Sequence, residues 1–367
     1  MFYRESNISR TEYETFWAGH NLADPLQGIS IDNQGKIYEN RLSFDGYSLV
    51  PLATDAEVVS VRNSRYTVFR NLDITGKMNR IGIHGWGNIG GGYMSIYDNH
   101  IINVRTAIDT TDYVDVSIYD NDISQFSDKG IYVGGKGFVS VKGNIIHDFS
   151  ADAGIGIGGW GLGGVGEVLI ENNDIYNCGA AIGDTHTDLL QVYNTDTEIS
   201  NVKIIGNKFH DTPAAFANIC PGLGRNFVIQ DNIFWNKYTS APQINLWISG
   251  IKGLTLTGNT IIGGLVLDNC QDIVMNDNII DLIDVRGNCS FLEIKGNVIN
   301  RGTNLSGRYI PINYIGQSMD KWNSPEWTSL FVDFANCDFR LKAVQPEPVI
   351  QTMTWIDGKQ YRVEEVK

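Results

Sequence analysis

Three ionisable side chains alternate over five residues in the middle of the chain. Asp184, His186 and Asp188 stand in the segment Gly-Asp-Thr-His-Thr-Asp-Leu-Leu-Gln, which ends at Gln191. In an extended segment alternate side chains share one face, so these three groups can converge. Carboxyl and imidazole groups are the usual general acids and bases of enzymes. The segment is therefore the first candidate site; the alternative is a polar stretch that only faces solvent.

The element that must position this segment is a repeated unit, an Asn followed two residues later by an apolar side chain. Successive units lie 19 to 34 residues apart. Each Asn follows one alternating apolar strand and precedes another. Asn tolerates left-handed backbone and suits a sharp bend, and stacked coils would align the Asn side chains as a ladder. The units stand at Asn99, Asn121, Asn144, Asn173, Asn207, Asn232, Asn259, Asn278 and Asn297, and Leu72 begins a similar unit without the Asn.

This repeat predicts an all-β chain, a right-handed parallel β-helix of about ten coils, because each unit buries its apolar side chains by stacking on its neighbours. We expect the β-helix over residues 46–301. Residues 1–45 carry little periodicity and are expected to cap the first coil. Residues 302–367 break the repeat and are expected to cap the last coil, since an open coil end would promote aggregation.

Alternation in the second strand of each coil separates inward from outward side chains. Rings mixed with amides suit sugars, whose CH faces stack on aromatic rings while their hydroxyls bond to amides. An ordinary solvated sheet face is the alternative. The first outward row is Gly82, Asp109, Tyr132, Gly156, Gln191, Phe216, Asn245 and Val266, and the second is His84, Thr111, Gly134, Gly158, Tyr193, Asn218, Trp247 and Asp268. From these rows we expect a substrate-binding face made of Asp109, Tyr132, Gln191, Asn245, His84, Tyr193, Asn218 and Trp247.

The two longest gaps between repeat units flank Asn173, and insertions in repeat proteins gather on the working face. The first insertion is the glycine-rich stretch 154–164. It is either a flexible connection or a groove wall in which Trp160 stacks on a sugar. Among basic residues, Lys129, Lys136 and Arg225 are expected to approach the face from turns, and Arg225 is a candidate for substrate binding.

The remaining histidines and the cysteines indicate packing. His147 and His210 share one turn position with Tyr176 and Trp235 in other coils, which favours a structural role. The five cysteines are too few and too scattered for a disulfide framework or a zinc site. Cys270 and Cys289 both follow Asn, so they are expected on neighbouring coils as packed thiols, with a disulfide bridge as the alternative.

Composition limits the partners. Apolar residues make up 42% of the chain and charged residues 19%, which permits a large core. The net charge of −14 argues against nucleic acid, which is bound through clustered Lys and Arg. No apolar run reaches the roughly 18 residues of a membrane span. The first residues lack the basic start and apolar stretch of a signal peptide. We expect a protein that acts outside the cell or on the surface of a virus particle, with its signal absent from this sequence or with export by another route.

The Asn-turn coils and the segment from Asp184 to Gln191 resemble the pectate-lyase-like superfamily of right-handed β-helix proteins. The stretch 330–342 resembles the tail that follows the coils in many bacterial members. The resemblance covers roughly residues 45–345 and implies a polysaccharide or oligosaccharide partner, because the superfamily includes polysaccharide lyases, glycoside hydrolases, uronan epimerases and phage tailspike depolymerases. The N-T-D, D-D and G-H-G motifs of the polygalacturonase type are not in place. The outward rows also lack the Arg or Lys base of the calcium-dependent pectate lyases.

Three functions follow from these residues. In a hydrolase, Asp184 and Asp188 would form the carboxylate pair, His186 would tune their protonation or hold substrate, and no cofactor would be needed. In a lyase, His186 would remove the proton α to a uronate carboxylate, while Asp184 and Asp188 would orient it or hold Ca²⁺. In a glycan-binding spike or adhesin, the three groups would only bind sugar. The acidic charge and the scarcity of cations favour a neutral glycan and hydrolysis. A monomer and a homotrimer both fit the sequence.

Overall fold

The computed structural model describes residues 2–4, 26–27, 29–32, 42–46, 48–50, 57–62, 66–86, 93–110, 115–134, 137–158, 166–179, 187–193, 198–213, 215–236, 245–303, 313–314, 331–333, 338–341, 354–356 and 359–361. All regular elements in these ranges are β-strands. Within the same ranges, no helix has the length and apolar character needed to cross a membrane.

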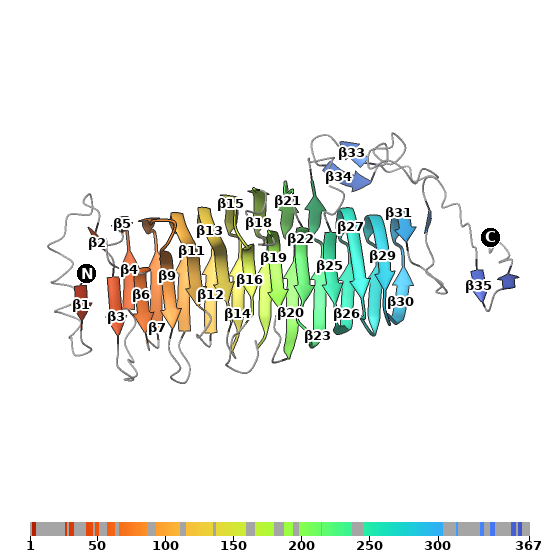
Figure 1. Ribbon diagram of the computed structural model, residues 1–367, viewed down its shortest axis with the longest axis horizontal. Helices are drawn as coiled ribbons and strands as arrows, with labels where there is room; N and C mark the ends of the chain where they lie inside the picture. Colours follow the sequence, from red (N-terminus) through yellow and green to blue (C-terminus); the bar gives the residue numbers. More distant parts are fainter. Residues whose placement is uncertain are drawn as a thin grey trace.

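One parallel sheet has 11 strands, and these strands stack along the long axis of the molecule (Figure 1). Neighbouring strands pair in register, so that Ile96, Ile118 and Val141 follow one another across three coils. The strands are β4 (Leu42–Asp45), β7 (Tyr66–Arg70), β10 (Tyr93–Tyr97), β12 (Asp115–Tyr119), β14 (Val139–Lys142), β17 (Val168–Glu171), β20 (Ile199–Ile205), β23 (Gly224–Gln230), β26 (Ile251–Thr257), β28 (Ile273–Asn276) and β30 (Phe291–Lys295).

A second parallel sheet of 21 strands forms the remaining sides of the coils. Its strands are β1 (Phe2–Arg4), β2 (Leu26–Gln27), β3 (Ile29–Asp32), β5 (Ser48–Val50), β6 (Glu57–Arg62), β8 (Asp73–Thr75), β9 (Ile81–Trp86), β11 (His100–Thr110), β13 (Asp122–Val133), β15 (Ile145–Phe149), β16 (Ala153–Ile157), β18 (Asp174–Cys178), β19 (Asp188–Tyr193), β21 (Lys208–His210), β22 (Ala215–Cys220), β24 (Ile233–Trp235), β25 (Asn245–Ser249), β27 (Thr260–Asp268), β29 (Ile279–Arg286), β31 (Val298–Thr303) and β32 (Asn313–Tyr314). The predicted fold class, an all-β parallel β-helix, is confirmed.

The predicted Asn ladder is present and buried. From Asn99 to Asn297, each Asn Nδ2 donates a hydrogen bond of 2.8–3.0 Å to Oδ1 of the Asn in the next coil. The same Oδ1 also accepts a backbone N–H, as Asn173 Oδ1 does from Asn144 at 2.9 Å. Leu72 takes the ladder position in its coil, because its backbone N–H donates to Asn99 Oδ1. The ladder therefore satisfies buried polar groups at the same corner of successive coils.

The left-handed backbone conformation lies one residue earlier than predicted. It falls on the residue before each ladder position, because the ladder side chain is committed to bonds along the axis. Gly can adopt a positive φ without strain, and Asn and Asp tolerate it. The positive-φ residues are Asn71, Asp98, Asp120, Gly143, Asn172, Gly206, Asp231, Gly258, Asp277 and Gly296.

The core is a continuous column of buried aliphatic and aromatic side chains. Rings from neighbouring coils stack on one another, as Phe126 does on Phe149 with ring centroids 4.5 Å apart. Cys270 and Cys289 lie on neighbouring coils as free thiols, and the Cys270 N–H donates to Cys289 Sγ at 3.4 Å. The prediction of packed thiols is confirmed for this pair.

Strands are described in both terminal segments that were expected to act as caps. Parallel pairing extends into the segment before residue 46, where β3 pairs with β6 and β4 pairs with β7. These early coils lack the Asn unit, which explains why the repeat did not reveal them. In the C-terminal segment, the antiparallel strands β33 (Phe331–Asp333) and β34 (Asp338–Leu341) pack on the side of the solenoid, where Phe339 meets Trp235. A second hairpin comprises β35 (Thr354–Ile356) and β36 (Lys359–Tyr361).

Replacement of a central ladder residue tests the role of the amides. Asn173→Ala leaves two buried donors of Asn144 without their acceptor. We expect the free energy of unfolding to fall by roughly 2–4 kcal/mol, because each orphaned buried donor costs about 1–3 kcal/mol. Urea denaturation measures the change. The same truncation at the exposed Asn288 is the control, and equal effects of the two substitutions would contradict the ladder's role.

Candidate functional site

The outward side chains of successive coils align differently from the two rows that the sequence predicted. Strand pairing aligns one residue from each of seven successive coils. We call the outward surface of β9, β11, β13, β16, β19, β22 and β25 the site face. Its central row is His84, Asp109, Tyr132, Gly156, Gln191, Asn218 and Trp247. Tyr193 lies two residues further along β19 and pairs with Cys220.

The correction arises from a bend at which two consecutive side chains face the core. Phe216 was predicted to point outward, but it is fully buried against Phe234, with ring centroids 6.0 Å apart. Leu189 and Leu190 are likewise both buried. This pair interrupts strict alternation, so Asn218 pairs with Gln191 and not with Tyr193. The bend is a feature of coil closure that alternation alone does not reveal.

Asp188 begins β19 and is almost completely buried, with 2% of its surface exposed. Its Oδ2 has no hydrogen-bond partner among the described residues. Burial, and secondarily the charge of Asp152, raises the pKa of Asp188 from 3.8 to about 7. A carboxyl that remains protonated near neutral pH can donate a proton, as a general acid must.

Lys129 lies two coils from Asp188 in the same register row, with Ala153 between them. Its Nζ is 2.7 Å from Asp152 Oδ2 and 3.1 Å from Asp128 Oδ1. Burial alone would lower the pKa of Lys129, but the two carboxylates outweigh burial and raise it. Lys129 is therefore a protonated amine, and its charge is balanced by the carboxylates of Asp128 and Asp152.

Tyr132 is the central aromatic side chain of the site face. Lys129 Nζ lies 5.1 Å from the centre of its ring, a cation–π contact. Burial raises the pKa of Tyr132, and the nearby Tyr193 and Asp109 add to the effect. Gly156 makes this packing possible, because a Cβ there would lie 3.0 Å from Tyr132 Cδ2 and 3.2 Å from Lys129 Cδ.

Unpaired polar atoms gather on this part of the molecule. Buried atoms without a hydrogen-bond partner among the described residues include Tyr132 OH, Thr187 Oγ1, Asp188 Oδ2 and Gln191 Oε1. They belong to β13, β19 and the residue just before β19, so they lie within three successive coils. Buried polar groups are normally paired, which makes such a concentration a mark of a ligand or water site.

The two ends of the row are already engaged. At one end, His84 Nδ1 is 3.1 Å from Glu57 Oε1. At the other, the Arg286 guanidinium lies 5.0 Å from the centre of the Trp247 ring and binds Asp284 at 2.7 Å. One face of Trp247 is thus occupied by Arg286.

Several candidates from the sequence are not on the site face or cannot be placed there. Arg225 lies on β23 of the other sheet, where its Nε binds Glu198 Oε2 at 2.7 Å, so the prediction that it approaches the face is wrong. Asp184, His186 and Trp160 lie outside the described residues, as does the side chain of Asn245. Their roles stay predictions.

A calcium ion held by Asp184 and Asp188 stays a prediction, because Asp184 lies outside the described residues, and the described surroundings of Asp188 add no ligands for it. Among the described residues, no three acidic, His or Cys side chains are grouped to hold a metal ion. Burial favours the neutral form of Asp188, whereas Ca²⁺ binds charged carboxylates. The neighbouring carboxylates of Asp128 and Asp152 are bound to Lys129.

The other histidines form a stack on the short strands. His147, Tyr176 and His210 lie with ring centroids 5.3 and 4.9 Å apart, and Trp235 follows His210 at 5.8 Å. Both ring nitrogens of His147 contact carboxylates, Asp122 at 2.9 Å and Asp148 at 2.8 Å. The rings cover one another's faces, in keeping with the structural role predicted for this row.

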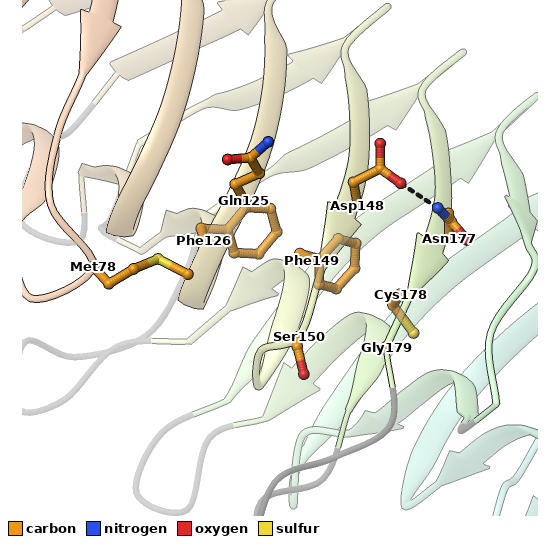
Figure 2. A pocket seen from close by; sticks show the side chains of 9 residues that line it. All are labelled: Met78, Gln125, Phe126, Asp148, Phe149, Ser150, Asn177, Cys178 and Gly179. Carbon is orange, nitrogen blue, oxygen red and sulfur yellow. Dashed lines mark hydrogen bonds between the residues drawn. The ribbon is translucent and has the colours of Figure 1, made fainter.

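A pocket of about 470 Å³ opens beside the same strands. Figure 2 shows the rings of Phe126 and Phe149 side by side, and the hydrogen bond from Asn177 to Asp148 at the rim. Cys178 lines one end of the pocket. The charge of Asp188 contributes to the raised pKa of this thiol, so the pocket lies close to the candidate acid. The pocket combines an apolar floor with a polar rim, as ligand pockets do.

The sequence did not identify Asp152 as part of this site. It lies just before β16, 36 residues before Asp188 in the chain, and the two residues become neighbours only when coils stack. The Asp188 N–H donates to the Asp152 carbonyl at 3.0 Å. The alignment of successive coils could have revealed Asp152. Lys129, Ala153 and Asp188 occupy equivalent positions in these coils, and Asp128 and Asp152 each precede such a position.

A family model described as "Right handed beta helix region" matches residues 27–197. Together with the strand pairing, this match identifies the chain as a right-handed parallel β-helix protein. No curated protein sequence matches the chain.

Three solved structures are similar to this chain at low identity. Tailspike protein 3 of bacteriophage CBA120 is 14% identical over 82% of this chain and 51% of its own, with a TM-score of 0.39. ORF18 of Geobacillus virus E2 is 12% identical over 78% and 56%, with a TM-score of 0.32. The A-module of mannuronan C-5 epimerase AlgE4 from Azotobacter vinelandii is 13% identical over 80% and 83%, with a TM-score of 0.24. The chain spans about half the length of the two viral proteins.

Two glycines on β16 and just after it test the packing of the site face. A Cβ on Gly158 would lie 2.5 Å from the Tyr193 carbonyl oxygen, whereas one on Gly156 meets only side-chain atoms of Tyr132 and Lys129 within 3.4 Å. Backbone cannot move aside as a lysine stem can. We expect Gly158→Ala to lower the free energy of unfolding by about 1–3 kcal/mol more than Gly156→Ala. Thermal or urea unfolding measures the difference, and the reverse order would contradict the described packing.

The titration of Asp188 predicts a pH-dependent stability. With its pKa raised from 3.8 to about 7, the folded chain holds a proton that the unfolded chain has lost. The resulting stabilisation is fully present below about pH 4 and is lost as the pH rises to about 7. Between these limits, wild type should lose up to about 1.4 kcal/mol per pH unit relative to Asp188→Asn. Urea unfolding from pH 4 to 8 measures this slope. The exposed Asp120→Asn controls for the loss of one charge, and parallel curves for wild type and Asp188→Asn would contradict the prediction.

Proposed function

We propose that the site face binds a polysaccharide and that Asp188 is the general acid for its hydrolysis. The observation that carries the proposal is the gathering, within three successive coils, of buried polar atoms of Tyr132, Thr187, Asp188 and Gln191 that have no hydrogen-bond partner among the described residues. A sugar presents hydroxyl groups that both donate and accept hydrogen bonds, and so can satisfy a phenol, an amide oxygen and a protonated carboxyl together. The pKa of about 7 for Asp188 supports proton donation near neutral pH.

The direction of the row supports a polymeric ligand. The central row runs along the solenoid axis with one residue from each coil, and neighbouring coils are about 4.8 Å apart. It offers amide side chains at Gln191 and Asn218, and aromatic rings at Tyr132 and Trp247. A glycan chain laid along the axis would contact several of them at once.

The proposed reaction uses two carboxyl groups, one protonated and the other charged. Protonated Asp188 gives its proton to the glycosidic oxygen as the bond from that oxygen to the anomeric carbon breaks. A charged carboxylate then either takes a proton from the attacking water or attacks the anomeric carbon itself. Asp152 is one candidate for this carboxylate, because Lys129 binds it at 2.7 Å. Asp184, predicted from the sequence, is the other, with His186 as a substrate-binding group.

The charges around the site favour a glycan without carboxylates. Asp109, Asp128, Asp152 and Asp188 bring acidic groups, and Lys129 is already bound by two of them. A polyuronate would therefore find no free cation among the described residues of the central row. A place of action outside the cell or on a virus particle, and a monomeric or trimeric state, stay predictions.

A glycan-binding protein without catalytic activity is the second candidate. The near-complete burial of Asp188 favours this function, because a general acid must come within hydrogen-bond distance of the glycosidic oxygen. In that case the unpaired polar atoms would bind sugar directly or through ordered water.

Product analysis separates these functions. The chain is incubated with a panel of neutral and uronate-containing polysaccharides, and new reducing ends and unsaturated ends are measured. We expect reducing ends without ultraviolet absorbance from unsaturation, and a fall in kcat of about 10²–10⁴-fold in Asp188→Asn, the usual contribution of a general acid. Asp120→Asn is the matched control away from the site face.

The other outcomes are equally clear. Unsaturated ends would show β-elimination and refute hydrolysis. Binding of a glycan with no new ends of either kind would establish the second candidate. Full hydrolytic activity in Asp188→Asn would refute the role of this residue.

A further inference from the structure

We propose that Lys129 is the positioning residue of this site: it holds Asp152 as a charged carboxylate beside Asp188, so that the proton of the carboxyl pair stays on Asp188. The inference rests on the proposed function only for the use of that proton in catalysis. The arrangement of charges is a property of the folded chain and can be tested without substrate.

Lys129 is held at this place by its surroundings. Only 9% of its surface is exposed, although lysine is rarely buried. Its Nζ donates to Asp152 Oδ2 at 2.7 Å and to Asp128 Oδ1 at 3.1 Å. Its stem passes over Gly156, and its charge lies on the ring of Tyr132. A buried amine with two carboxylate acceptors stays protonated and fixes the position of both.

The β-helix register brings this ion pair to Asp188. Lys129, Ala153 and Asp188 align across three successive coils. Ala153, the residue between the other two, has a small side chain. The Asp188 N–H bonds to the Asp152 carbonyl at 3.0 Å, which ties the two acidic residues together through the backbone.

Among the described residues, the other titratable groups near Asp188 are neutral. They are the thiols of Cys178 and Cys220, and burial raises their pKa values to about 11 and about 12. Around Lys129, the other ionisable neighbours are Asp128 and Tyr132. Asp128 is partly exposed and also lies 3.9 Å from Arg105 Nε. Asp152 is therefore the group that joins the lysine to the candidate acid.

Two neighbouring carboxyls titrate as a pair, and a cation at one of them decides which gives up its proton first. Lys129 favours the charged form of Asp152. The charge of Asp152, together with burial, then favours the neutral form of Asp188. Without the lysine, Asp152 would be a partly buried carboxylate with no counter-ion beside a second carboxyl, and it would retain a proton to higher pH.

This arrangement of charges can be tested by measuring how many more protons the folded chain binds than the unfolded chain. Each proton that the folded chain holds and the unfolded chain lacks raises the unfolding constant about tenfold per pH unit. We expect Lys129→Met to add a further factor of about ten per pH unit over wild type between roughly pH 5 and 7. The double variant Lys129→Met with Asp152→Asn should lose this added factor, whereas Lys129→Arg, which keeps the charge, should keep the wild-type slope. Urea unfolding across this pH range gives the pH dependence of the unfolding constant for wild type and the three variants.

An unchanged slope in Lys129→Met would overturn the proposal, and so would an extra slope that persists when Asp152 is also replaced. If Lys129→Met does not fold, Asp152→Asn alone gives the answer. Removal of the Asp152 charge should let Asp188 lose its proton at lower pH, so the rise in the unfolding constant should end at lower pH than in wild type. An unaltered curve would refute the pairing. These measurements are independent of substrate, so a failure of Asp188→Asn to affect hydrolysis would refute the proposed function and leave the charge arrangement standing.

Discussion

The stack of buried Asn side chains is the interaction on which the rest of this structure depends. Each amide bonds to the next coil and to a backbone carbonyl of the preceding one, as Asn173 does to Asn207 and to Val141. A buried amide that misses its partner is costly, so each coil must present its Asn at the same corner. The chain can change length only away from that corner. This explains how repeat spacings from 19 to 34 residues coexist in one regular solenoid.

The Asn ladder also influences which side chains come together on the site face. Once the Asn corner is fixed, the strand that follows must bend before it reaches the opposite side. In β11, two consecutive side chains, Ala107 and Ile108, lie in the core, and the equivalent residues of β19 are Leu189 and Leu190. The next outward positions then fall in register across the coils and bring Tyr132, Gly156 and Gln191 into one line. The bend therefore sets which side chains become neighbours on the outer surface.

This line of residues differs from the Asn ladder in how well its polar atoms are paired. Along the ladder the donors and acceptors meet, whereas near β19 a phenol, a hydroxyl, a carboxyl and an amide oxygen are buried without a partner among the described residues. An unpaired buried group weakens the fold, and a low local dielectric makes the effect larger. The surrounding ladder and the aromatic core supply the rigidity that tolerates it. Asp188 is an example, since burial disfavours its charged form and raises its pKa.

Much of the fold could be predicted from the sequence. The Asn units indicated the parallel β-helix and its ladder, because a repeat that stacks on itself must repeat the same contacts. The pairing of Cys270 with Cys289 on neighbouring coils followed from the same reasoning. The early coils around β3 and β4 escaped notice because they lack the Asn that made the other coils visible.

The candidate site was predictable only in part. The sequence pointed to Asp188 and to the side chains Tyr132 and Gln191, since an alternating strand beside an insertion is a local pattern. It did not reveal that Asn218 lines up with Gln191, that Arg225 lies on the other sheet, or that Asp152 and Lys129 stand beside the acid. The sequence by itself determined the repeating unit, because the amide ladder and apolar alternation act between equivalent positions of adjacent coils. The tertiary structure alone decided the site, because its charges come from residues far apart in the chain whose proximity depends on where each coil bends.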